Sequence, residues 1–143
     1  MLRVALPNKG QLAEPARAML AEAGYLQGAT GRDLVVQDPD NDAEFFFLRP
    51  KDIATYVGSG TLDVGITGRD MLLDSGADAD EIMGLGFAGS TFRLAVPVGS
   101  VGEVSELQGR RIATSYPGLL AHFLSTHNIS AEIVRLDGAV ENA

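Results

Sequence analysis

Five positively charged side chains lie at or next to the ends of predicted strands: Lys9, Arg32, Arg49, Lys51 and Arg69. Arginine grips a phosphate or carboxylate through two parallel hydrogen bonds, and lysine supplies a compact positive charge. Lys9 stands beside a glycine just before a predicted helix, and Arg49 directly follows the strand sequence FFFL, so a rigid backbone could aim both. This placement predicts an anion-binding site. All five could instead be solvated surface charges, an interpretation that fits Lys51 and Arg69 best.

The stretch LDVGITGRDMLLDSG, residues 62–76, is typical of a buried strand, a glycine turn and a helix. Gly68 allows a turn that a Cβ would hinder, and Asp70 is placed where its carboxylate could cap the helix. The N–H groups at a helix start bind anions or polar ligand edges, and ligands of α/β sheets lie at the carboxyl ends of strands. The stretch is therefore a candidate ligand wall, although such a corner can also do no more than connect two elements.

The other polar and aromatic residues give weaker evidence for a functional site. The aspartates of the sequence DPDND are typical of a turn. His122 and His127 are five residues apart on a predicted helix and share no face, so we interpret both as ordinary helix residues. Tyr116 lies in a Pro-Gly corner at a strand end, where its ring could stack on a base or fill a lobe interface.

Composition limits the class of protein. The 143 residues carry a net charge of −8, which argues against a nucleic-acid or anionic-membrane surface. There is no cysteine, so thiolate catalysis, disulfides and cysteine metal sites are excluded. The N-terminus is typical of a strand rather than a signal peptide, and no apolar run approaches the ~20 residues of a membrane span. We therefore expect a cytoplasmic protein without nucleic-acid or membrane partners.

Strands and helices alternate, which favours parallel pairing and an α/β fold. Strands are expected at residues 2–6, 34–37, 44–48, 64–66, 92–98, 111–114 and 131–136. Helices are expected at residues 11–23, 50–57 and 119–127, with a further helix after the glycine turn at Gly68. A boundary near residue 90 divides a first lobe, 1–90, from a partial second lobe, 91–143.

The sequences VALPNKGQL, FFFLRPKDIATYVGSGTLDVGITGRDMLLDSGA and RIATSYP together resemble ATP phosphoribosyltransferase, the first enzyme of histidine biosynthesis. The similarity runs over nearly the whole chain in the same order. It implies a type II periplasmic-binding-protein-like fold, with two α/β lobes of mixed, mainly parallel sheets. It also implies the reaction, in which N1 of ATP attacks C1 of phosphoribosyl pyrophosphate and pyrophosphate leaves. Magnesium would accompany the pyrophosphate donor, with no protein ligand assigned.

The resemblance also assigns roles to residues. Lys9, Arg32 and Arg49 match the family's basic residues near the phosphates and would be catalytic through charge stabilisation. The residues assigned to nucleotide binding are Gly10, Gly68, Asp70, Thr114 and Tyr116. Gln11 is a departure, since many members carry Arg there, and this places more of the leaving-group stabilisation on Arg32.

A larger departure concerns the end of the sequence. The family's diagnostic motif begins with a Glu after an LDG-type turn and continues to a Ser/Thr-Gly-x-Thr loop, whereas this sequence reads LDGAVENA. We therefore expect an incomplete second lobe, either as a fragment of the enzyme or as a natural short product. The alternative function is a non-catalytic nucleotide-binding module of the same fold. We also expect a homo-oligomer, because an apolar sheet edge near residues 131–136 would favour self-association.

Overall fold

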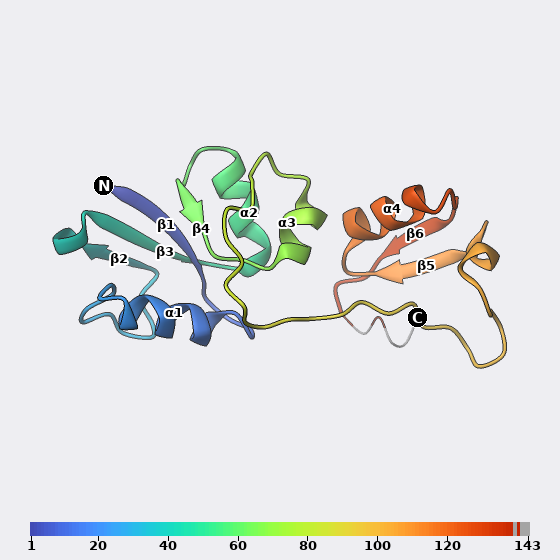
Figure 1. Cartoon of the computed structure of the whole chain (residues 1–143), viewed down its shortest axis with the longest axis horizontal. Helices are drawn as coiled ribbons and strands as arrows, with labels where there is room; N and C mark the ends of the chain where they lie inside the picture. Colours follow the sequence, from blue (N-terminus) through green and yellow to red (C-terminus); the bar gives the residue numbers. More distant parts are fainter. Residues whose placement is uncertain (139, 141–143) are drawn as a thin grey trace. The chain divides into compact units, whose positions relative to one another are not determined.

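The computed structural model describes residues 1–138 and 140, and the chain divides into two compact units, Met1–Gly89 and Ser90–Ala143. Both units combine strands and helices, which confirms the α/β class (Figure 1). The first unit contains β1 (Leu2–Pro7), α1 (Ala13–Glu22), β2 (Val35–Asp38), the 3-10 helix η1 (Pro39–Asn41), β3 (Ala43–Leu48), α2 (Pro50–Gly58), β4 (Val64–Gly65) and α3 (Arg69–Ser75). The second contains η2 (Val104–Leu107), β5 (Arg111–Thr114), α4 (Pro117–Thr126) and β6 (Glu132–Arg135).

The first unit is built on a four-stranded mixed sheet with the order β2-β3-β1-β4. β1 runs parallel to both of its neighbours, with Pro7 opposite Leu48 of β3 and Ala5 opposite Gly65 of β4. β2 and β3 are antiparallel and are joined through η1, as the turn-rich sequence DPDND predicts. The sheet is therefore mixed but mainly parallel.

The two faces of this sheet hold separate parts of the core. On one face, Phe45 and Phe47 of β3 pack with Leu6 of β1, and Leu20 of α1 covers them. On the other face, Ala5 packs with Ile53 of α2. Figure 1 shows α1 and α2 on opposite sides of the sheet. Burial on both faces explains why residues 4–7 of β1 are a continuous apolar run.

The helix ends follow the expected local chemistry. Gly24 follows α1 with φ of 93°, a conformation that glycine adopts without strain, and Tyr25 N donates to Leu20 O at 2.9 Å. Pro50 occupies the first position of α2, where its missing N–H costs no helical hydrogen bond. The helix expected at residues 11–23 thus ends within one residue of its predicted end, and the helix expected at residues 50–57 begins at Pro50 as predicted.

The second unit has a small parallel sheet formed by β5 and β6. The strand predicted at residues 92–98 is wrong for this structure, in which residues 91–98 are exposed and belong to no helix or strand. The alternating side chains Phe92, Leu94 and Val96 are 50%, 42% and 41% exposed. Strand propensity reflects packing on a half-buried pleated surface, and among the described residues this segment has no neighbouring strand.

The close approach of β4 to α2 gives a stability prediction. A Cβ added to Gly65 would lie 2.5 Å from Ile53 Cγ2 and 3.2 Å from Ala5 Cβ, both in the core. Gly65→Ala should therefore lower the free energy of unfolding by about 1–3 kcal/mol, the usual cost of overpacking. Urea denaturation followed by circular dichroism measures this loss. Gly31→Ala is the control, because no atom lies within 4 Å of the added Cβ there. Equal stability of the two variants would contradict the prediction.

Candidate functional site

Three parallel strands of the first unit end at the same edge of the sheet. Beyond the paired strands, Asn8 N donates to Leu48 O at 2.8 Å, and Ile66 N donates to Ala5 O at 3.0 Å. The segments that follow these strands carry Lys9 with Gly10, then Arg49, then Gly68 with Asp70. In an open α/β sheet this carboxyl edge is where ligands bind. The parallel register therefore gathers five of the predicted site residues at one edge.

Arg32 lies near the same edge although it precedes a strand rather than following one. Because β2 is antiparallel to β3, the residues before β2 lie beside the carboxyl end of β3, and Phe47 N donates to Leu34 O at 2.9 Å. Arg32 lies in the turn two residues before Leu34, at the carboxyl end of β3. The side chain of Arg32 is exposed.

The cations at this edge differ in their partners. Lys9 and Arg32 form no ion pair within the part of the chain that the structure describes. Arg49 donates from Nε to Asp52 Oδ2 at 2.8 Å, on the first turn of α2. Arg49 has extended backbone as the N-cap residue of α2, so its position follows from both β3 and α2. The protein therefore neutralises the positive charge at this edge only in part, and the remaining charge could attract an anion.

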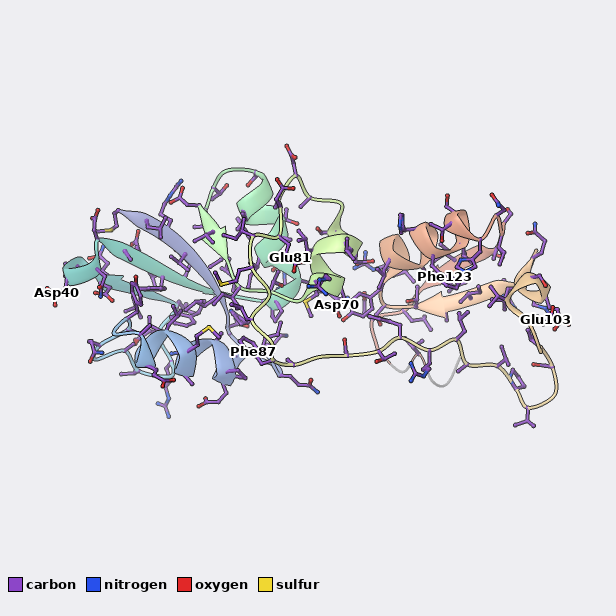
Figure 2. The ribbon with its side chains drawn as sticks, in the orientation of Figure 1. Asp40, Asp70, Glu81, Phe87, Glu103 and Phe123 are labelled. Carbon is purple, nitrogen blue, oxygen red and sulfur yellow. The ribbon has the colours of Figure 1, made fainter. Side chains whose placement is uncertain are left out.

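The expectation that Asp70 caps a helix is wrong in its details. The N-cap residue of α3 is Gly68, with φ of −78° and ψ of 141°, and it provides no side-chain cap. Asp70 is half-buried in the first turn of the helix, where its Oδ1 accepts a hydrogen bond from Met71 N at 2.8 Å. A carboxylate in the first turn still complements the helix dipole. Asp70 is labelled beside α3 in Figure 2.

The β4–α3 corner is tied to α2. Thr67 Oγ1 donates to Pro50 O at 2.9 Å, so the corner before Asp70 is fixed next to the residue that follows Arg49. A Cβ added to Gly68 would collide with the Asp70 carboxylate. Glycine at this position therefore lets the Asp70 carboxylate lie against the backbone, and its φ of −78° is an ordinary one.

Thr114 and Tyr116 lie together in the second unit, where β5 leads into α4. Thr114 Oγ1 accepts a hydrogen bond from Tyr116 N at 3.0 Å, and Ser115 Oγ donates to Leu136 O at 2.7 Å. The Tyr116 ring meets Phe92 edge to face, with ring centroids 5.1 Å apart. These contacts shape the carboxyl edge of the β5–β6 sheet, with Tyr116 as its aromatic residue.

Comparisons with known proteins agree with one another. The family described as HisG: ATP phosphoribosyltransferase matches residues 49–143. The chain belongs to the ATP phosphoribosyltransferase family. The ATP phosphoribosyltransferase of Arthrobacter sp. (strain FB24) is 64% identical over 143 residues, which are 100% of this chain and 50% of that protein. That of Saccharopolyspora erythraea is 64% identical over 99% of this chain and 50% of its own length.

A solved structure shows the same architecture. The ATP phosphoribosyl transferase (HisG:HisZ) complex from Thermotoga maritima contains a chain with a TM-score of 0.71 and 25% sequence identity to this one. The match covers 99% of this chain and 67% of that chain. The periplasmic-binding-protein-like α/β fold is thus confirmed. This chain spans about half the length of the curated ATP phosphoribosyltransferases that it matches.

Three residues that support the site were missed by the sequence analysis: Asp52, Thr67 and Glu81. Asp52 could have been found, because it follows Arg49 by three residues on a predicted helix. Thr67 and Glu81 give no such signal, since their partners lie 17 and 12 residues away. In the described residues there is no group of three or more His, Asp or Glu that could hold a metal, and no helix suited to cross a membrane.

The opposite edge of the sheet carries a neutralised cation. Arg3 donates from Nη2 to Asp63 Oδ1 and from its backbone N to Asp63 Oδ2, both at 2.8 Å. The Arg3 side-chain hydrogen bonds, followed by its backbone N–H, lower the pKa of Asp63 to about 2. This pair joins the amino ends of β1 and β4, so it supports the sheet rather than offering charge to a ligand.

The Arg3–Asp63 pair predicts an acid dependence of stability. Because the pKa of Asp63 is lower in the folded chain than the ~3.9 of an unfolded one, its contribution is full above pH ~4 and is lost as pH falls through about 2. Asp63→Asn should lower the melting temperature at pH 7, and the difference from the unchanged protein should shrink towards pH 2. Asp40→Asn, which alters an exposed carboxylate of η1, is the control. A difference that is constant between pH 7 and pH 2 would exclude this role of Asp63.

Proposed function

We propose that this chain forms the nucleotide-binding part of an ATP phosphoribosyltransferase catalytic region. The proposed reaction transfers phosphoribosyl from phosphoribosyl pyrophosphate to N1 of ATP and releases pyrophosphate, the first step of histidine biosynthesis. The observation that carries the proposal is the gathering of Lys9, Arg32 and Arg49 at one sheet edge of a chain that belongs to this family. In a protein of net charge −8, such an edge favours a polyanionic ligand.

The chemistry needs positioning and charge stabilisation more than proton transfer. The lone pair of adenine N1 attacks C1 of the donor, the C1–N1 bond forms, and the bond between C1 and the pyrophosphate oxygen breaks with its electron pair leaving on pyrophosphate. Adenine N1 carries no proton to remove, so no general base is required. Lys9, Arg32 and Arg49 would stabilise the negative charge that develops on the leaving group.

The remaining residues suit the nucleoside rather than the phosphates. Asp70 is a half-buried carboxylate, which accepts N–H or O–H donors and repels phosphate. Gly10 is exposed with open space around it, and Gly68 lets the Asp70 carboxylate lie against the backbone. Tyr116 offers an aromatic face for stacking on a base, and Thr114 fixes the Tyr116 backbone. Asp70 and Tyr116 are therefore assigned to the adenine nucleotide.

Magnesium is proposed to arrive with the pyrophosphate donor. The described residues provide no cluster of carboxylates or histidines for a resident ion. Pyrophosphate oxygens and water are hard ligands of the kind that Mg²⁺ prefers. No residue of this chain is assigned to the ion.

A non-catalytic nucleotide-binding module is the second candidate. It would bind the nucleotide through the same residues of the described part of the chain without catalysing transfer. Association with other chains is proposed under either function. The Thermotoga maritima neighbour is a HisG:HisZ complex, and here β5 and β6 form a sheet with open edges among the described residues.

Ligand binding by the 143-residue chain tests the proposed function. We expect ATP and AMP to bind weakly, and we expect no measurable transfer because the chain lacks the length of its catalytic relatives. Calorimetry with each nucleotide, and a turnover assay with magnesium, ATP and phosphoribosyl pyrophosphate, measure both. Absence of nucleotide binding would refute the proposed function for this chain. Robust turnover would exclude the non-catalytic module.

Arg49 provides a test of the cationic edge in a chain extended to the length of its relatives. Arg49→Ala should lower kcat by the equivalent of roughly 2–4 kcal/mol, as removal of other preorganised donors does. The Kd for ATP should change less, because charge on the leaving group develops only in the transition state. Arg111→Ala, an exposed change at the amino end of β5, is the control. An unchanged kcat would remove Arg49 from the site.

A further inference from the structure

α3 carries Asp70 but has little support of its own. It has seven residues, none of them buried, and no side chain caps its start. A helix this short is not stable in isolation, and α3 packs against α2. The orientation of Asp70 therefore depends on the contacts that hold the first turn of α3.

The first residue of α3 is held by a two-point ion pair. Arg69 Nη2 donates to Glu81 Oε1 at 2.6 Å, and Arg69 Nε donates to Glu81 Oε2 at 2.8 Å. Such parallel bonds fix the orientation of both planar groups as well as their distance. The hydrogen bonds from Arg69 also lower the pKa of Glu81. Figure 2 shows Glu81 labelled near Asp70 and α3.

Glu81 belongs to a segment that is anchored at a second point. A Cβ added to Gly58, the last residue of α2, would lie 2.9 Å from Asp78 N and 3.1 Å from Ala77 Cβ, so the backbone after α3 passes close to the end of α2. Glu81, three residues after Asp78, forms the ion pair with Arg69. The segment 77–81 thus runs from the end of α2 to the start of α3 and joins the two helices.

We propose that Glu81 is a positioning residue for the β4–α3 corner. Its ion pair with Arg69 fixes the first turn of α3. The same ion pair thereby orients the Asp70 carboxylate towards the adenine nucleotide. The functional part of this inference rests on the proposed function. The Arg69 guanidinium is bound by the Glu81 carboxylate. Arg69 differs in this from Lys9 and Arg32, which form no ion pair among the described residues. Arg69 therefore contributes to the site by fixing the position of α3 rather than by binding the ligand.

The test compares Glu81→Gln with Asp80→Asn in the 143-residue chain. Asp80 is the neighbouring exposed carboxylate, so its change controls for loss of one negative charge. Amide hydrogen exchange at Met71 and Leu72 reports on α3, since these N–H groups donate to Asp70 Oδ1 and Gly68 O. Glu81→Gln should speed exchange there about two- to fivefold, as loss of an exposed ion pair allows, and should weaken the Kd for ATP by a similar factor. Asp80→Asn should change neither.

Reversal of the pair separates positioning from direct contact. Arg69→Glu and Glu81→Arg should each speed exchange in α3, and the double variant should return both exchange and ATP affinity towards those of the unchanged chain. Unaltered exchange in Glu81→Gln would overturn the proposal. So would a double variant with slow exchange but no recovery of ATP affinity, because Arg69 would then contact the nucleotide itself. If the unchanged chain does not bind ATP, the proposed function fails, and the exchange measurements alone decide whether Glu81 holds α3.

Discussion

β1 is hydrogen-bonded on both sides to strands that run in its own direction, β3 and β4. Because these three strands are parallel, they all end at the same edge of the sheet, and the segments that follow them begin there. Burial of β1 on both faces locks its register, because a slip of one residue would exchange the side chains that face α1 with those that face α2. The positions of Lys9, Arg49 and Asp70 all follow from this constraint.

Charge is distributed unevenly over the two edges of the sheet. At the amino edge, Arg3 is neutralised by Asp63 through several hydrogen bonds. At the carboxyl edge, Lys9 and Arg32 form no ion pair in the portion of the chain described here, and Arg49 has one carboxylate neighbour. An exposed ion pair contributes little to stability, so leaving cations unpaired costs the fold little. It leaves positive charge available to a ligand in a protein that is otherwise acidic.

Sequence reasoning was most successful where local chemistry decides the structure. The range of β1, the end of α1 and the start of α2 all depend on near neighbours in the sequence, and the predicted ranges match the observed ones within one residue at these points. The segment 92–98 shows where such reasoning fails: its alternating apolar residues are typical of a strand, but a strand forms only when a neighbouring strand pairs with its backbone. Asp70 shows a subtler failure, because a shift of two residues in the helix start turned a predicted cap into a first-turn carboxylate.

The sequence identifies candidate site residues, but it does not identify most of the residues that hold them in place. Family resemblance selects Arg49, and helical spacing could have added its partner Asp52. Only the structure shows that Thr67 ties the neighbouring corner to Pro50. Glu81 is one of several carboxylates between residues 78 and 81, and its sequence context does not distinguish it from Asp78 or Asp80. It becomes distinct only because the chain folds back from the end of α2 to the start of α3. A site on short loops thus depends on contacts that the motif itself does not contain, and the proposed chemistry, which relies on positioning, depends on these contacts as much as on the cations.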